Sequence, residues 1–97
     1  MNVQWSQTAT KHLQAIFDYI AIDSEQYALR IVDRILRKSE QLRLIPEAGH
    51  IVPEYDTPSI REVFEGDYRI IYETTSESTT ILAVIHGARL LPDVTDR

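Results

Sequence analysis

Three arginines lie in or beside segments of this 97-residue chain that have the composition of β-strands: Arg61, Arg69 and Arg89. Arg69 stands out because its neighbours along the chain are mostly apolar, and a buried charge without a partner is very costly. Its guanidinium must therefore reach solvent or find a carboxylate. One interpretation is an ion pair with Glu62 or Glu73 that joins neighbouring strands. The other is an anion-binding site on a sheet face that no helix covers.

A histidine and a further arginine stand where the last apolar, β-branched segment ends, in the run His86-Gly87-Ala88-Arg89. Strand ends commonly hold functional groups on a rigid scaffold, and Gly87 permits a backbone geometry that would re-aim Arg89. The imidazole titrates near neutral pH and could serve as a general acid or base. The alternative is a structural histidine that is held by hydrogen bonds.

A second group of arginines lies between the apolar positions of a predicted helix. Arg30, Arg34 and Arg37 share one helix face, opposite the apolar stripe. One interpretation is a solvated face whose charges pair in part with Asp33 and Glu40. The other is a docking face for an acidic partner.

The composition excludes several other chemistries. Cysteine is absent, which removes disulfides, thiolate nucleophiles and cysteine-based zinc sites and fits a reducing compartment. The three histidines lack metal-ligand spacing and no glycine-rich loop could hold a phosphate, so we expect no metal and no cofactor. No apolar run approaches the ~20 residues of a membrane helix, and we see no signal peptide. The net charge of −5 disfavours a global attraction to nucleic acid.

The first half of the chain has the pattern of one strand and two helices. Val3 and Trp5 alternate with polar residues, as in an edge strand. Two apolar stripes at helical spacing follow, over residues 9–20 and 28–42. Only a short break, at 22–24, separates them, which predicts an antiparallel helical hairpin.

The second half has the pattern of strands, because the hydrophobic period changes near Pro46. Segments 60–64, 68–74 and 79–86 are rich in β-branched and aromatic residues, and polar, turn-like residues separate them. Neither half can bury its apolar face alone. We therefore predict one α+β domain over residues 1–97, with the helical hairpin packed on one face of an antiparallel sheet.

In several of these segments the chain resembles the RelE/ParE superfamily, small bacterial and archaeal toxins of type II toxin–antitoxin modules. The resemblance is carried by the Trp5 strand, the predicted helix from Ala9 to Tyr19, the turn at 46–49, the block from Arg61 to Tyr72 and the closing run 86–89. It covers nearly the whole chain. The fold that it implies is a strand, a helical hairpin and an antiparallel sheet.

Two activities are known in this superfamily, and the resemblance implies different residues for each. RelE-like members cleave mRNA in the ribosomal A site; their pattern would make Arg61, Arg69, His86 and Arg89 the catalytic residues here. The lysines and the final tyrosine of that pattern are missing, however, and Arg61 stands among three acidic residues. ParE-like members, which the chain resembles more closely, are described as inhibitors of DNA gyrase and not as ribonucleases.

The resemblance also implies a cognate antitoxin, whose disordered tail would fold as it wraps around the toxin. We expect this contact to use the arginine face of Arg30, Arg34 and Arg37 together with the apolar Leu90 and Leu91. Three functions stay open: a gyrase inhibitor, which we favour, a ribosome-dependent endoribonuclease, and a non-toxic homologue that only binds the antitoxin and helps repress its operon. Each of them is a cytoplasmic function.

Overall fold

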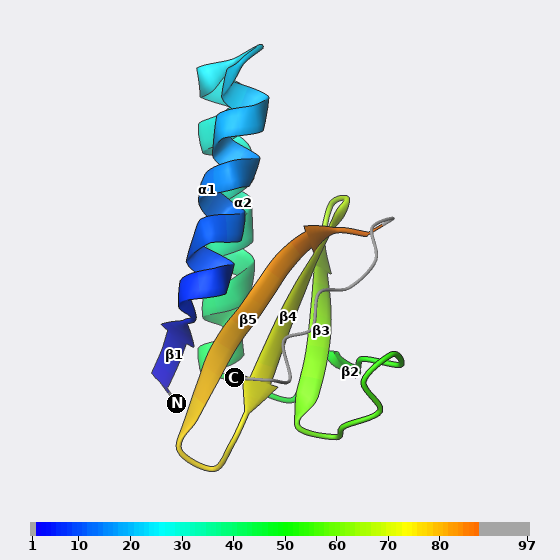
Figure 1. Cartoon of the computed structure of the whole chain (residues 1–97). Coiled ribbons are helices and arrows are strands. Elements are labelled where there is room, and N and C mark those ends of the chain that lie inside the picture. Colours follow the sequence, from blue (N-terminus) through cyan, green and yellow to red (C-terminus); the bar gives the residue numbers. More distant parts are fainter. Residues whose placement is uncertain (1, 88–97) are drawn as a thin grey trace.

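The fold consists of one sheet with a helical hairpin on one of its faces (Figure 1). The computed structural model describes residues 2–87 of the chain. Its elements in chain order are β1 (Asn2–Trp5), α1 (Gln7–Ala21), α2 (Glu25–Glu40), the short 3₁₀ helix η1 (Gln41–Arg43), β2 (His50–Ile51), β3 (Ile60–Glu65), β4 (Tyr68–Thr74) and β5 (Ser78–His86). The strands lie in the order β1-β5-β4-β3-β2. The predicted α+β architecture is confirmed.

The first strand lies at a sheet edge as predicted, but it runs parallel to its neighbour β5, so the sheet is mixed and not antiparallel throughout. Val3 lies opposite Thr79 and Trp5 lies opposite Ile81. The chain leaves β1 through a helical hairpin and not through a tight turn, so no turn geometry imposes antiparallel pairing. A second difference is β2, a two-residue strand in a segment whose sequence indicated only a turn and a loop.

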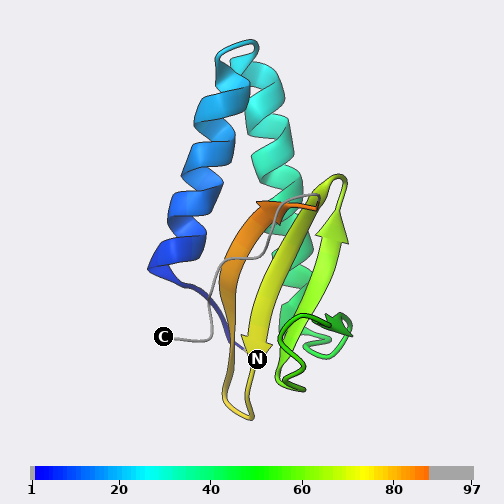
Figure 2. The same ribbon diagram turned by 45° about the vertical axis from the view of Figure 1, so that its right-hand side comes forward.

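The helices form where the sequence supplies both N-caps and apolar stripes. The Ser6 hydroxyl accepts a hydrogen bond from the Ala9 N–H at 3.0 Å, and Ser24 caps α2 through the Tyr27 N–H at 3.1 Å. Such caps satisfy backbone donors that the first helical turn leaves free. Figures 1 and 2 show that the hairpin continues well beyond the end of the sheet.

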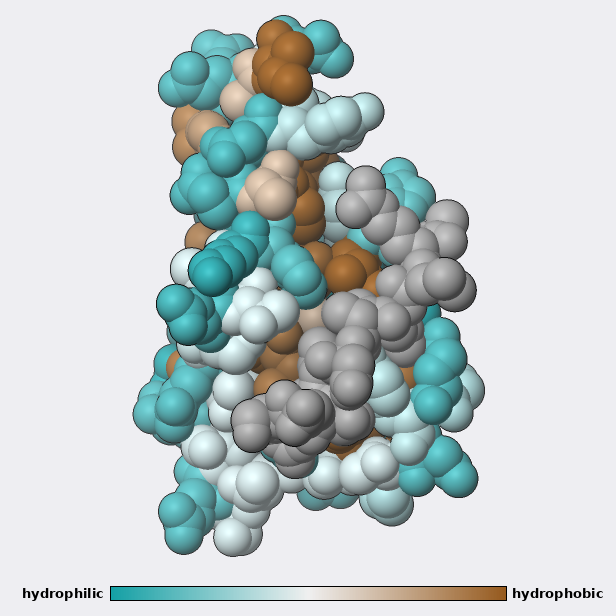
Figure 3. Space-filling model, viewed as in Figure 1, coloured by the Kyte–Doolittle hydropathy of each residue, from teal (hydrophilic) through white to brown (hydrophobic). Residues whose placement is uncertain are grey.

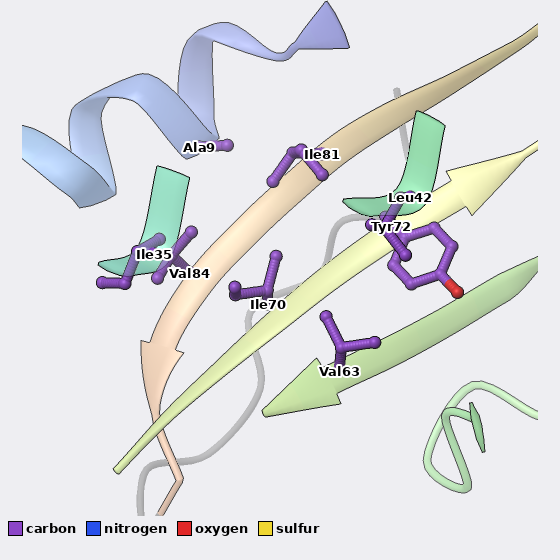
Figure 4. Close-up of a cluster of buried hydrophobic side chains, with 8 residues drawn as sticks. All are labelled: Ala9, Ile35, Leu42, Val63, Ile70, Tyr72, Ile81 and Val84. Carbon is purple, nitrogen blue, oxygen red and sulfur yellow. The ribbon is translucent and has the colours of Figure 1, made fainter. Parts of the chain in front are cut away.

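Apolar side chains form one cluster on each face of the sheet. The cluster under the helices contains Ala9, Ile35, Leu42, Val63, Ile70, Tyr72, Ile81 and Val84 (Figure 4). The cluster on the other face contains Val52, Ile60, Ile71, Leu82, Ala83 and Ile85, with Tyr55 packed against it. Burying one large aliphatic side chain stabilises a fold by about 1.5–3 kcal/mol. Both faces of the central strands therefore contribute to stability, which explains their long apolar runs.

Beyond the end of β1, Ser6 and helix α1 form the hydrogen bonds with the backbone of β5 that a neighbouring strand would otherwise form. The Ser6 N–H donates to the Ile81 carbonyl at 2.9 Å, and the Ser6 hydroxyl donates to the Leu82 carbonyl at 3.2 Å. Further along α1, the Nδ1 atom of His12 accepts a hydrogen bond from the Val84 N–H at 3.2 Å. Burial lowers the pKa of His12, which favours the neutral imidazole that this contact requires.

Candidate functional site

Arg69 lies on the sheet face opposite the helices and is almost fully buried, with 8% of its surface exposed. Its Nε atom donates to Glu62 Oε1 at 2.6 Å. Its two terminal nitrogens donate to the two carboxylate oxygens of Glu54 at 3.1 and 3.2 Å. The pairing with Glu62 is one that the sequence suggested. The second partner is Glu54, in the loop between β2 and β3, and not Glu73.

The charges around Arg69 stabilise its protonated form and leave no excess of positive charge. The hydrogen bonds that Arg69 donates to Glu54 are the largest of the causes that raise the pKa of Arg69. In return, the Arg69 hydrogen bond holds the pKa of Glu54 below its usual value. One guanidinium faces two carboxylates here, so the group carries a formal charge of about −1. An added phosphate would meet this net negative charge, which disfavours anion binding at Arg69.

Arg61 lies on the opposite face of the sheet from Arg69. Its position in β3 pairs with Tyr72, a member of the cluster under the helices, whereas Arg69 pairs with Phe64. Side chains alternate along a strand, and positions 61 and 64 of β3 are three residues apart, so they point to opposite faces. Arg69 lies beside Phe64 and shares its face, so the two arginines point to opposite faces. The sequence therefore supplied two arginines in adjacent strands, and the register separates them.

The Arg61 side chain fixes the loop before β2. Its Nη1 atom donates to the Gly49 carbonyl at 3.0 Å, and the Tyr72 hydroxyl accepts from the Gly49 N–H at 2.9 Å. A Cβ atom at position 49 would lie 2.7 Å from the Tyr72 hydroxyl and closer still to the Glu62 carbonyl oxygen, which explains why glycine stands there. Burial raises the pKa of Tyr72, so the phenol stays protonated.

His86 is exposed at the end of β5 and stacks edge-on against Tyr68, with ring centroids 5.7 Å apart. The residue before it, Ile85, pairs with Arg69, so His86 points to the other face of the sheet. Arg89 lies outside the described residues, as do Leu90 and Leu91. Within residues 2–87, the structure therefore does not bring the predicted catalytic residues into one site.

The predicted arginine face of α2 is exposed, and its members differ in their partners. Arg37 forms an ion pair with Asp33 at 2.9 Å. Beyond this face, Arg43 in η1 pairs with Glu40 at 3.1 Å. Exposed pairs of this kind contribute little to stability. Arg34 forms no ion pair or hydrogen bond with any residue in the described part of the chain.

Arg34 lines a groove between α2 and the tight turn that joins β3 to β4. The groove has a volume of about 290 Å³. Its lining residues are Ile20, Tyr27, Ile31, Arg34, Ile35, Glu65, Gly66, Asp67 and Tyr68. Gly66 has a φ of +56°, a conformation that glycine adopts without steric cost. The resulting turn places two acidic residues on the wall of a groove that also holds an arginine.

The charges that line this groove do not neutralise one another. The carboxylates of Glu65 and Asp67, like the guanidinium of Arg34, form no ion pair or hydrogen bond within residues 2–87. Apolar side chains make up much of the remaining lining. An extended or helical segment with one apolar side and charges of both signs at its edges would complement the groove. This site was not predicted, because its walls come from two distant elements.

The described part of the chain shows no metal centre and no membrane span. None of its clusters of histidine, aspartate or glutamate could hold a metal ion. None of the helices within residues 2–87 is both long and apolar enough to cross a membrane.

Comparisons with known proteins agree with the fold. The family model described as ParE toxin of type II toxin-antitoxin system, parDE, matches residues 3–91. Among solved structures, the chain is similar to one from the chromosomal ParDE TA system from P. aeruginosa. The TM-score is 0.74 at 21% sequence identity, and the match covers 89% of this chain and 95% of that chain. No match is found among curated proteins.

Proposed function

Because the chain belongs to the family of ParE toxins of type II toxin–antitoxin systems, we propose that it arrests growth by inhibiting DNA gyrase and that a cognate antitoxin neutralises it. The observation that supports a binding mechanism over RNA cleavage is the state of Arg69. Its guanidinium is buried and shared between Glu54 and Glu62. It acts as a structural group that holds the loop on the sheet.

Cleavage of RNA by this chain would need several cationic groups around one phosphate, because the transition state concentrates negative charge. Arg61 and His86 lie on the sheet face opposite Arg69 and each has another contact. Inhibition by binding needs no such cluster. It also tolerates the net charge of −5, because the target is a protein and not a nucleic acid.

The groove beside α2 supports an antitoxin contact that is more specific than a general attraction to the arginine face. An amphipathic antitoxin segment would lay its apolar side against the partly exposed Ile31. An acidic residue at one edge would pair with Arg34, and a basic residue at the other edge would pair with Glu65 or Asp67. We place the complex in the cytoplasm, where gyrase acts.

The first test of this proposal is induced expression of the chain alone and together with its cognate antitoxin. We expect growth arrest in the first case and normal growth in the second. If the chain expressed alone does not slow growth, it is a non-toxic homologue and the proposed function is wrong.

A second test separates the gyrase mechanism from RNA cleavage. We expect the purified toxin to block supercoiling by purified gyrase, while the 5′ ends of cellular mRNA stay unchanged after induction. His86→Ala should keep its toxicity, since the exposed imidazole has no role in binding gyrase under this proposal. New 5′ ends within translated codons, lost in His86→Ala, would instead establish the ribonuclease.

A further inference from the structure

We propose that the free end of the helical hairpin, residues 18–29, is the surface that enters the toxin's protein target, and that the matching site is an apolar cleft with a basic rim. The inference rests on the proposed function, since it assigns the target contact of that same toxin. It assigns the groove beside α2 to the antitoxin and the hairpin end to the target. Ile20 and Tyr27 lie at the border and line the groove as well.

Apolar side chains are exposed at this end in an unusual concentration. Four of the nine large hydrophobic residues that are exposed in the described part of the chain fall within residues 19–29: Tyr19, Ile22, Tyr27 and Leu29. Tyr19 is 78% exposed and Ile22 is 80% exposed. Figure 3 shows hydrophobic atoms at the tip of the hairpin. Single exposed hydrophobic residues need no explanation, but their concentration at one end of the hairpin favours an interaction surface there.

The shape of this end distinguishes it from a groove. Helices of 15 and 16 residues are each about 23 Å long, and the sheet supports only the part nearer to Ser6 and Leu42. The end of the hairpin projects beyond the sheet (Figure 2). A disordered tail binds best in a groove on a folded partner. A rigid projection fits a preformed cleft instead, which a large folded target can offer.

The charge of this end determines the chemistry of the matching cleft. Residues 18–27 include Asp18, Asp23 and Glu25 and contain no lysine or arginine. Asp18 accepts a hydrogen bond from Gln14 at 2.9 Å, whereas the carboxylates of Asp23 and Glu25 have no partner within residues 2–87. A rim of arginine or lysine around an apolar cleft would pair with these carboxylates. The same charges would repel RNA or DNA phosphates.

The test measures inhibition of supercoiling by purified gyrase, with toxin released from its antitoxin complex and refolded. Ile22→Asn and Tyr19→Gln should each raise the half-inhibitory concentration at least about tenfold, as for exposed anchors that become buried on binding. The matched control is Leu44→Asn, because Leu44 is 86% exposed but lies after η1, away from the hairpin end. It should stay within about twofold of the wild type.

Charge reversal tests the basic rim separately. Asp23→Lys should weaken inhibition, and the difference from wild type should shrink as salt is added, because salt screens exposed charges. All variants should bind the antitoxin within about twofold of wild type, which also reports a correct fold.

Each alternative result counts against the proposal. If Ile22→Asn and Tyr19→Gln inhibit gyrase as strongly as wild type, the hairpin end is not the target surface. If they lose antitoxin affinity equally, the end belongs to the antitoxin site. Concentration-dependent dimers in sedimentation that Ile22→Asn abolishes would show a contact between copies of the chain. Finally, a wild-type toxin that leaves gyrase active refutes the proposed function before any variant is compared, and this inference falls with it.

Discussion

Arg69 and Arg34 carry the same charge in two very different environments. Arg69 is buried on the sheet and holds two carboxylates, one on β3 and one in the loop before it. Arg34 is exposed on α2 and has no partner in the described part of the chain, although two carboxylates line the same groove. The charge of Arg69 is paired within the fold. That of Arg34 is available to another molecule, so the location of an arginine says more about its role than the number of arginines does.

The largest expected effect is on stability when the buried arginine is replaced. Arg69→Met leaves Glu62 buried without its partner, and breaking a buried ion pair costs about 3–5 kcal/mol. Urea denaturation should show this loss in the free energy of unfolding. Arg34→Met is the matched control and should change that free energy by less than about 0.5 kcal/mol. Equal effects of the two variants would remove the distinction between the two arginines.

A smaller loss is expected when the buried carboxylate partner is neutralised. Glu62→Gln keeps an oxygen that can accept from Arg69 Nε but removes its charge, which should cost about 1–2 kcal/mol of unfolding free energy. Glu54→Gln should cost less, because Glu54 is half exposed and water can replace its hydrogen bonds. Thermal and urea unfolding of both variants would show which substitution lowers the free energy of unfolding more. The reverse order would mean that the loop contact dominates.

The exposed arginine should affect binding and not stability. Arg34→Glu should weaken antitoxin affinity at least about tenfold, equivalent to about 1.4 kcal/mol, because it places a third acidic group in the groove. Isothermal titration calorimetry can measure this change. Arg30→Glu is the control, since Arg30 is exposed on the same helix but does not line the groove. A similar loss in both variants would favour a diffuse electrostatic attraction to the whole arginine face.

The smallest effect concerns acid sensitivity of the loop contact. The pKa of Glu54 is lowered in the folded protein, chiefly by its hydrogen bond from Arg69. Its contribution is therefore complete above the unfolded pKa, near 4.5, and is lost as the pH falls through the lower folded value. As the pH is lowered from about 5 to about 3, the free energy of unfolding should fall less steeply in Glu54→Gln than in the wild type. An unchanged slope would show that the carboxylate stays solvated in solution.

The elements and the two-layer architecture could be predicted from the sequence because they depend on neighbours along the chain. The apolar stripes over 9–20 and 28–42 have the helical period, and β4 spans the predicted segment 68–74. The direction of β1 could not be predicted in this way. The chain between β1 and the rest of the sheet is a long hairpin, and the alternation of Val3 and Trp5 is the same in either direction.

The candidate sites depended on contacts that no local pattern contains. The sequence by itself determined that Arg69 needs either solvent or a partner of opposite charge, because a guanidinium buried in an apolar strand is very costly without one. The tertiary structure decided that Glu54, 15 residues away, supplies much of that pairing, and that Arg61 points to the other face. It also decided that Arg34 lines the same groove as Glu65 and Asp67. Periodicity fixes which side of a strand or helix a residue occupies, but the path of a loop and the register between strands fix which charges meet.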